Sequence, residues 1–344
     1  MSRRQPAEWE PHSALWSAWP ADAELWADDL APARAELASM LVAIADPDPQ
    51  TGAPRGARIR LCVNGEEAEA SARAALDARF CDFIQAPYGD IWVRDTGPIF
   101  VEEADGRPAA VAFRFNGWGE KFRLGRDEEM AARIAAAAGA RLTAFPMVAT
   151  EGGAIEVDGE GTAIVTRDSI LNPNRNPGAT EADIERCLEA ALGVSRVIWL
   201  DRGLAGDHTD GHVDNVARFI APGAAICMTP SGPDDPNRDV LEDIRRTLEN
   251  ARDASGRRLE VLALPSPGRV ENADGEIMPA SYMNFVISNR TVVMPQFGAA
   301  PDGEAVERLA AAMPGRRVTG SPAKHILTGG GAFHCATQQE PAWK

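Results

Sequence analysis

Residues 181–228 read EADIERCLEAALGVSRVIWLDRGLAGDHTDGHVDNVARFIAPGAAICM and contain one complete unit of the pattern that decides the fold. Apolar residues at three-to-four spacing predict a helix over about 180–193, and RVIWLD at 196–201 predicts a short apolar strand. A polar loop then leads to a predicted hairpin over 215–228. The unit is therefore interpreted as helix, strand, loop and hairpin.

The same order recurs along the chain. Predicted helices start at about residues 66, 126, 181, 238 and 303, and a further helix is predicted at about 24–45. Units that cannot bury their own faces must stack on neighbours, and a ring of about five units leaves no exposed sheet edge. The run SALWSAWP at 13–20 and the C-terminal AFHCAT are strand-like pieces that we expect to complete one unit together. An ordinary two-layer α/β protein remains the alternative.

The composition narrows the classes of partner and compartment. A net charge of −16 over 344 residues disfavours nucleic acid and anionic membranes as partners. An acidic surface that keeps the protein in solution is the preferred interpretation of this charge, and steering of a small cationic substrate is the alternative. The N-terminus lacks an apolar run typical of a signal peptide, so we expect a cytoplasmic protein. The cysteines are odd in number and never spaced as CxxC, which argues against a disulfide framework or a structural zinc site: Cys62, Cys81, Cys187, Cys227 and Cys335.

GGGAFHC at 329–335 marks a candidate nucleophile. Glycines such as Gly330 and Gly331 let the backbone turn tightly and approach a ligand, and Cys335 follows them on a predicted strand. His334 is adjacent to Cys335 in sequence, but neighbouring residues on a strand point to opposite faces. The catalytic base is therefore expected on another segment.

The loop DHTDGHVDN at 207–215 supplies that base. His212 and Asp214 are two residues apart, so they share one face if the segment is extended, and Gly211 permits a turn before them. A histidine near a thiol stabilises the thiolate and can later donate a proton. We therefore predict that His212 serves Cys335.

Two further loops each carry one carboxylate. RDTGP at 94–98 contains Asp95, and EGG at 151–153 contains Glu151, each on a predicted loop between strands. Alone, either motif reads better as a turn cap or as a surface ion pair with Arg94. Together with Asp214 they place three carboxylates around one cysteine. Such a pocket suits a planar, cationic guanidinium, against whose face Trp92 can pack.

The same loop also permits a different assembly. A string of alternating acids and histidines can bind a metal ion, and this reading predicts a metal-dependent hydrolase. A metal site on this loop would not explain the glycine-flanked Cys335 or the RDTGP and EGG loops. The metal-dependent hydrolase therefore ranks below the cysteine mechanism. The string comprises Asp207, His208, Asp210, His212 and Asp214.

Taken together, these motifs resemble those of agmatine deiminases, in the guanidino-group-modifying (pentein) superfamily, over nearly the whole chain. The matching stretches occur in the family's order: AEWEPHSALWSAWP, WVRDTGPIFV, EGGAIEVDGEGT, LNPNRNP, TDGHVDNVARF, ASYMNF, PQFG and GGGAFHCATQQEP. The resemblance implies one catalytic domain over 1–344, an α/β fold built as a pseudo-fivefold propeller, and an active site on its central axis. It also implies a homodimer.

The resemblance also implies a role for each candidate residue. Cys335 matches the nucleophile, His212 the general acid and base, and Glu151 the acid that orients the histidine. Asp95 and Asp214 match the guanidinium-binding carboxylates. The implied reaction converts agmatine to N-carbamoylputrescine and ammonia through a covalent amidino-cysteine intermediate, without a metal or organic cofactor. Peptidyl arginine is the alternative substrate.

Three positions depart from the family pattern near the predicted site. Ala332 and Phe333 stand where the family commonly has asparagine and a branched aliphatic residue, and His208 stands where it has an acid. We expect these positions to border the site and to affect recognition of the substrate's tail rather than the core chemistry.

Overall fold

The computed structural model describes residues 3–343, which form five separate β-sheets. Four sheets have three strands and the fifth has four. The three-stranded sheets are β4 (Ile99–Glu102), β5 (Pro108–Arg114) and β6 (Arg141–Ala149); β7 (Glu156–Val157), β8 (Thr162–Thr166) and β9 (Arg196–Leu200); β10 (Ala217–Ala221), β11 (Ala224–Thr229) and β12 (Glu260–Pro265); β13 (Val286–Ile287), β14 (Thr291–Gln296) and β15 (Arg317–Pro322).

Each three-stranded sheet has the same connectivity. The first two strands form an antiparallel pair, and the third strand runs parallel to the second. A parallel neighbour requires a crossover, which a helix provides in every sheet. These crossover helices are α6 (Met130–Ala137), α8 (Glu181–Leu192), α9 (Arg238–Asn250) and α10 (Asp302–Ala312), and the fifth sheet has two of them, α2 (Leu30–Ala45) and α3 (Glu66–Ala75). The predicted unit of helix, strand, loop and hairpin is confirmed.

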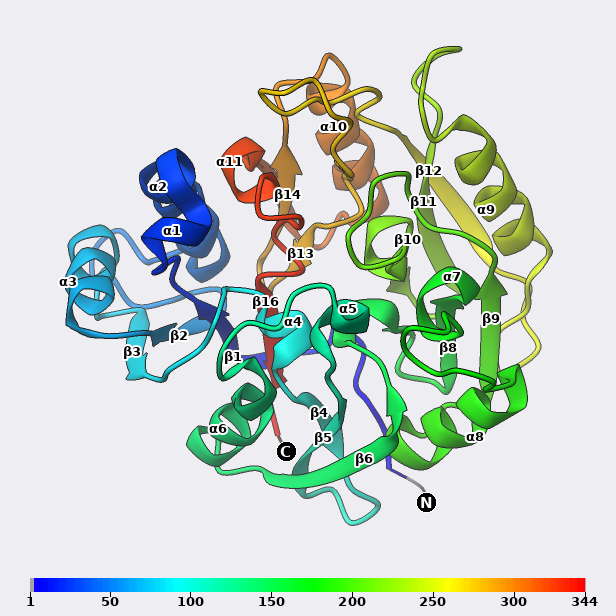
Figure 1. The fold of residues 1–344 in the computed structure, drawn as a ribbon, viewed down its shortest axis with the longest axis horizontal. Coiled ribbons are helices and arrows are strands. Elements are labelled where there is room, and N and C mark those ends of the chain that lie inside the picture. The colour runs from blue at the N-terminus through cyan, green and yellow to red at the C-terminus, as the bar shows by residue number, and fades with distance from the viewer. Residues whose placement is uncertain (1–2, 344) are drawn as a thin grey trace.

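The fifth sheet joins the two ends of the chain. Its order is β16 (Thr337–Pro341), β1 (His12–Ala18), β2 (Arg58–Val63) and β3 (Cys81–Gln85). Strand β16 pairs with β1 in antiparallel fashion, with Trp16 opposite Gln338, which confirms that the two ends complete one unit. Figure 1 shows the five sheets grouped around a common centre with the crossover helices at the periphery. The ring is therefore confirmed, and the two-layer alternative is wrong.

Helix α8 illustrates how local sequence sets these elements. The Thr180 hydroxyl accepts from the Asp183 backbone N–H, and the Asp183 side chain accepts from the Thr180 backbone N–H, which forms a capping box. Ile184, Leu188 and Leu192 are buried at four-residue spacing. The helix therefore begins at a cap and turns one apolar stripe toward its sheet.

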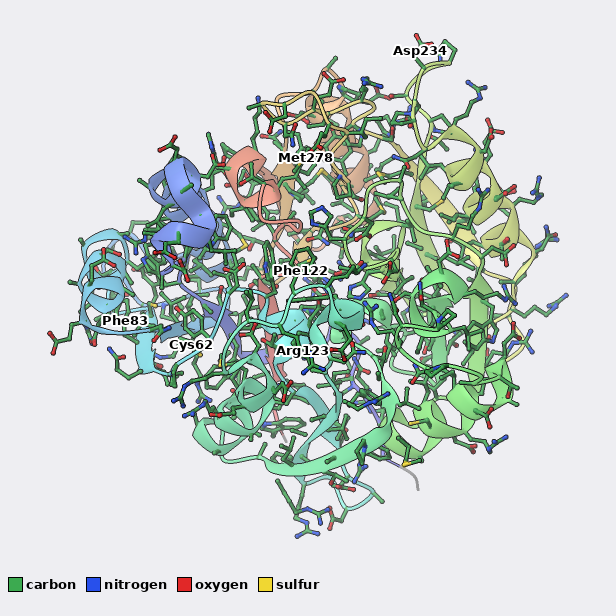
Figure 2. All side chains as sticks on the ribbon, viewed as in Figure 1. Cys62, Phe83, Phe122, Arg123, Asp234 and Met278 are labelled. Atoms are coloured by element: carbon green, nitrogen blue, oxygen red, sulfur yellow. The ribbon has the colours of Figure 1, made fainter. Side chains whose placement is uncertain are left out.

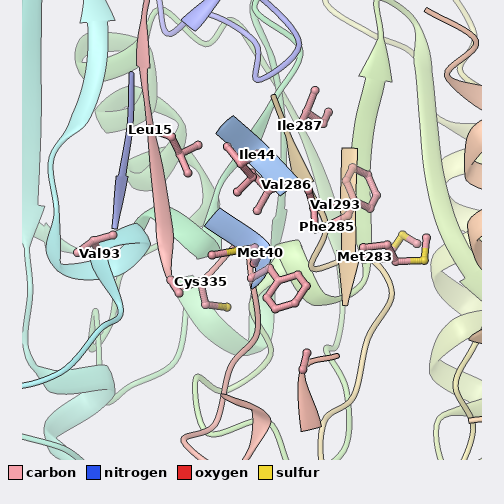
Figure 3. Close-up of a cluster of buried hydrophobic side chains, with 14 of the residues drawn as sticks. Leu15, Met40, Ile44, Val93, Met283, Phe285, Val286, Ile287, Val293 and Cys335 are labelled. Carbon is pink, nitrogen blue, oxygen red and sulfur yellow. The ribbon is translucent and has the colours of Figure 1, made fainter. Parts of the chain in front are cut away.

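The largest buried cluster extends beneath the centre of the ring. It includes Leu15 from β1, Met40 from α2 (Leu30–Ala45) and Phe285 beside β13, and it also contains Cys335 (Figure 3). Packed interiors resist displacement of their members. The candidate nucleophile is thus fixed by the core as well as by its loop.

Short helical turns fill the loops near the centre. Figure 1 places α4 and α5 in the middle of the ring. The short helical turns are α1 (Ala23–Trp26), η1 (Ala27–Asp29), α4 (Val93–Thr96), α5 (Gly117–Glu120), η2 (Asp127–Glu129), η3 (Gly152–Ala154), α7 (Arg167–Ile170), η4 (Val213–Asn215) and α11 (Lys324–Leu327). Across residues 3–343, none of the helices has the length and apolar content needed to cross a membrane.

The structure corrects the predicted local conformation of three motifs. Asp95 lies on the helical turn α4 rather than on an open loop, and Asp214 lies in the 3₁₀ turn η4 rather than on an extended segment. Cys335 lies in a turn just before β16 instead of on a strand. In each case local backbone hydrogen bonds, such as that from Asp95 N to the Trp92 carbonyl, replace a strand ladder.

Candidate active site

The five predicted catalytic residues meet at the centre of the ring. Three of them surround Gly153 closely. A Cβ added to Gly153 would lie 2.6 Å from His212 Nδ1, 2.9 Å from Asp95 Oδ1 and 3.1 Å from Asp214 Oδ2. The thiol of Cys335 lies 3.5 Å from Asp214 Oδ2. Loops from four different sheet units therefore bring these buried side chains together.

His212 is held between two carboxylates. Its Nε2 lies 3.3 Å from Glu151 Oε2, and its Nδ1 lies 3.7 Å from Asp95 Oδ2. Burial acts to lower the pKa of His212, but the charge of Asp95 and the hydrogen bond and charge of Glu151 outweigh it and raise the pKa to about 9. His212 is therefore an imidazolium at neutral pH and can donate a proton.

Glu151 is itself fixed by a buried arginine. Arg175 Nε donates to Glu151 Oε1 at 2.7 Å, and both side chains are almost fully buried. Burial opposes ionisation of Glu151, yet His212 and Arg175 together hold its pKa below the ordinary value. Glu151 therefore favours its charged form next to His212 Nε2.

Asp95 and Asp214 differ in their surroundings. Asp95 accepts from Gly153 N at 2.9 Å and from Trp118 Nε1 at 2.8 Å, and burial raises its pKa to about 6. Asp214 accepts from His334 Nδ1 at 2.7 Å, and His334 and His212 hold its pKa below the ordinary value in spite of burial. At neutral pH both side chains can present negative charge to a cation.

Cys335 is a buried thiol with a polar neighbour. The Asn284 side-chain amide donates to Cys335 Sγ at 3.1 Å, and the Asn284 carbonyl oxygen accepts from the backbone N–H of Cys335 at 3.2 Å. Burial, then the charges of Asp214 and Asp95, raise the pKa of the thiol well above its ordinary value. A cation between these carboxylates would relieve that repulsion and favour the thiolate.

A cavity of about 330 Å³ leads from the surface to Cys335 and Asp95. Trp92, Gly330 and Gly331 line it, as the sequence predicts for contacts with a ligand. Gly330 has a φ of +99°, and a Cβ there would lie 2.8 Å from His208 Nδ1. A Cβ on Gly331 would lie 2.7 Å from the Trp92 ring. Side chains at these glycines would therefore close the cavity.

The mouth of the cavity is partly apolar. Phe122 is 40% exposed and its ring lies 5.6 Å from that of His208, while Leu25, 46% exposed, also lines the cavity. Figure 2 labels Phe122 near the centre of the face shown. Of the three positions that depart from the family pattern, His208 lines the cavity, as expected. Ala332 and Phe333 are buried and are not among the residues that line the cavity.

Some residues of the site were missed or misjudged from the sequence. His334 does not pair with Cys335, as predicted, but it binds Asp214 directly. Asn284 and Trp118 contact the reacting groups and carry no sequence pattern of their own beyond the short stretch ASYMNF around Asn284. Arg94 is buried and binds Gln338 and Gln339, so it forms no surface ion pair with Asp95.

In the segment 207–214, where acids and histidines alternate, the side chains point in different directions. Asp207 accepts from Asn215, Asp210 pairs with Lys121 and Arg175, and the ring of His208 faces the cavity mouth. Within the described part of the chain, no group of three histidine, cysteine or acidic side chains has the arrangement of a metal site. The geometry therefore does not support the metal-dependent alternative.

Known proteins resemble this chain over nearly its whole length. The chain is 38% identical to the agmatine deiminases of Stutzerimonas stutzeri (strain A1501) and Pseudomonas aeruginosa (strain LESB58), in each case over 98% of this chain and 95% of the relative. The structure of the agmatine deiminase of Enterococcus faecalis superposes with a TM-score of 0.91 at 30% identity, over 99% of this chain and 96% of that one. A dimethylarginine dimethylaminohydrolase adduct, at 14% identity and a TM-score of 0.52 over 95% and 99% of the two chains, shares the fold.

These full-length matches confirm the predicted enzyme class, a hydrolase of guanidino C–N bonds in the pentein fold. The sequence profile of Porphyromonas-type peptidyl-arginine deiminases matches residues 4–341, and the chain belongs to this family.

Proposed function

We propose that the protein hydrolyses agmatine to N-carbamoylputrescine and ammonia, with Cys335 as the nucleophile. The observation that carries the proposal is the pair of buried carboxylates, Asp95 and Asp214, around the Cys335 thiol at the end of a cavity. Buried carboxylates require a cationic partner, and a planar guanidinium matches two of them through paired hydrogen bonds.

Unsatisfied atoms support the position of the guanidinium. Among residues 3–343, Asp214 Oδ1 and His212 Nδ1 are buried side-chain atoms without a hydrogen-bond partner. Such atoms in a native protein call for an explanation, and a bound ligand is one. A guanidinium N–H donates to Asp214 Oδ1 in the proposed complex, while His212 Nδ1 faces the amino group that leaves.

The first half of the reaction forms the covalent intermediate. The Cys335 thiolate attacks the guanidinium carbon, and a C–S bond forms while Asp95 and Asp214 hold the substrate's nitrogens. His212 gives its proton to one amino nitrogen, the C–N bond breaks, and ammonia departs. An amidino group attached to Cys335 remains, and His212 is neutral.

The second half hydrolyses this intermediate. Neutral His212 takes a proton from a water molecule, whose oxygen attacks the amidino carbon. The tetrahedral adduct collapses, the C–S bond breaks, and the thiolate returns. The last hydroxyl proton is taken up by the released ammonia, and the ureido product leaves.

Asp29 supports agmatine as the substrate. The cavity walls include three carboxylates, Asp29, Asp90 and Asp95. Asp90 is buried, accepts from Trp26 Nε1 at 2.9 Å, and burial raises its pKa to about 7. Asp29 binds His325 through Oδ1 at 2.6 Å, and its side chain is 34% exposed. We assign Asp29 to the distal amine of agmatine, which peptidyl arginine lacks.

Asp29→Asn is expected to raise KM for agmatine about 10-fold with little change in kcat, because it removes one charge-assisted contact to the distal amine. Butylguanidine lacks that amine, so its kinetics should not change. The matched control is Asp28→Asn, which removes the neighbouring exposed carboxylate outside the cavity wall. Equal effects of the two variants on agmatine would contradict the assignment of Asp29.

The decisive test of the substrate is ammonia release by the purified protein from agmatine, L-arginine and a peptide with internal arginine, with and without a chelator. We expect turnover of agmatine at a rate that the chelator leaves unchanged. Ammonia from the peptide but none from agmatine would overturn the proposed substrate.

The pH profile of kcat/KM for agmatine is expected to peak between about pH 6 and pH 9. Below the pKa of Asp95, about 6, its carboxylate is protonated and holds the cation less well; above the pKa of His212, about 9, the acid is lost. Glu151→Gln removes a charge that raises the pKa of His212, so the alkaline limb should move down by about one pH unit. Glu307→Gln, on the exposed face of α10, is the control. An unmoved limb in Glu151→Gln would contradict the role of Glu151.

A further inference from the structure

A buried chain of three groups extends from the N-terminal segment to the reaction centre. Glu8 Oε2 lies 3.0 Å from His334 Nε2, and His334 Nδ1 lies 2.7 Å from Asp214 Oδ2. All three residues are at most 5% exposed. Glu8 precedes β1 and lies 326 residues from His334 in the sequence. Only the closure of the ring brings Glu8 to His334.

Each ring nitrogen of His334 has a carboxylate as its partner. The Arg218 guanidinium and His334 outweigh the opposing effect of burial and hold the pKa of Glu8 below its ordinary value. The pKa of Asp214 is also lowered in spite of burial. The ring of His334 is therefore held at both ends, by Glu8 at Nε2 and by Asp214 at Nδ1.

Other charged groups surround this chain of contacts. Arg218 binds both Glu8 and Glu156, and Arg94 Nε donates to the backbone carbonyl of His334. Burial raises the pKa of Glu156, and its neighbours Arg218 and His334 counteract that effect. Since these groups are fixed and buried, the ring of His334 has little freedom to rotate.

The consequence for Asp214 is a defined orientation. His334 occupies Oδ2, while Oδ1 is left without a partner in the described residues. A carboxylate that is held through one oxygen presents its other oxygen in a fixed direction. Hydrogen-bond partners behind the binding groups fix orientation in the same way in other preorganised sites.

We propose that Glu8 and His334 are positioning residues, which hold Asp214 so that its free oxygen receives the guanidinium. The inference rests on the proposed function only in that it needs a guanidinium substrate. Glu8 holds His334, His334 holds Asp214, and Asp214 binds the substrate. The N-terminal segment thereby becomes part of the active-site architecture.

The test compares kcat and KM of Glu8→Gln, His334→Asn and the double variant for the guanidine that the wild type turns over best. Glutamine removes the charge that binds Nε2 of His334 and so weakens the hold on the ring. We expect Glu8→Gln to lose about 10-fold in kcat/KM at pH 7, mainly through a higher KM, because Asp214 binds the guanidinium. A general structural defect would instead lower kcat and leave KM unchanged.

His334→Asn keeps a donor near Asp214 Oδ2, because the asparagine amide takes the place of Nδ1, but it no longer reaches Glu8. The double variant should therefore have the same KM as His334→Asn alone. Glu10→Gln, on the same N-terminal segment and paired with Arg4 at the surface, should leave kcat and KM unchanged. Rates are divided by the concentration of Cys335 that a substrate-like amidine labels, so that unfolded protein is not counted.

The outcomes separate the two proposals. If the wild type hydrolyses another guanidine but not agmatine, the proposed substrate is overturned. The positioning roles are then tested by kcat and KM for that other guanidine. A KM in Glu8→Gln equal to that of the wild type overturns the positioning role. Should Glu8→Gln not fold, His334→Ala decides: a KM equal to that of the wild type would overturn the positioning role of His334.

Discussion

Cys335→Ala is expected to abolish ammonia release from agmatine, with kcat lower by at least about 10⁴-fold. Alanine cannot form the C–S bond, and no other cysteine can replace it: Cys62, Cys81 and Cys227 are buried elsewhere, and Cys187 lies on helix α8. The carboxylates remain in place, so substrate binding should survive the substitution. Steady-state ammonia assays and the thermal shift caused by agmatine measure the two effects separately.

Cys187→Ala is the matched control, since it removes a half-buried thiol on α8 and should keep wild-type activity. A rate that persists in Cys335→Ala and disappears with a chelator would contradict the cysteine mechanism and favour the metal-dependent alternative. Wild-type activity in Cys335→Ala without chelator sensitivity would contradict both.

The ring of five units was predictable because each crossover helix has a strong 3.6-residue apolar period. Predicted helix starts agree within a few residues for α3, α8, α9 and α10. Strands β6 and β15 were not predicted. Their sequences, RLTAFPMVA and RVTGSP, contain proline, and both lie at the edge of their sheets, where a proline is tolerated and the apolar signal is weak.

The meeting of the candidate catalytic residues was predictable because they lie in short polar motifs beside glycine. His212, Asp95 and Cys335 carry recognisable chemistry at fixed sequence positions, even though their local backbone differs from the prediction. Glu8 and Asn284 do not lie in a polar motif beside glycine. Their contacts, with His334 and with Cys335, form only when the ring closes. Tertiary contacts of this kind cannot be inferred from spacing along the chain.

Gly153→Ala is expected to lower kcat/KM for agmatine by about 10²- to 10³-fold while the protein remains folded. The backbone at Gly153 has no positive φ, so alanine is conformationally tolerated. The new methyl group, however, would lie 2.6 Å from His212 Nδ1 and 2.9 Å from Asp95 Oδ1. Neither side chain can withdraw freely, because His212 is fully buried and Asp95 is bound by Trp118.

The substitution therefore acts on three catalytic groups at once without removing any of them. Overpacking in a buried site costs about 1–3 kcal/mol of stability, which thermal unfolding should detect as a modest decrease in Tm. Gly315→Ala is the control, since no atom lies within 4 Å of the added Cβ and activity should not change. Wild-type turnover by Gly153→Ala would mean that His212, Asp95 and Asp214 need not be held at these separations. Residue identity alone, rather than these separations, would then account for guanidine hydrolysis at this site.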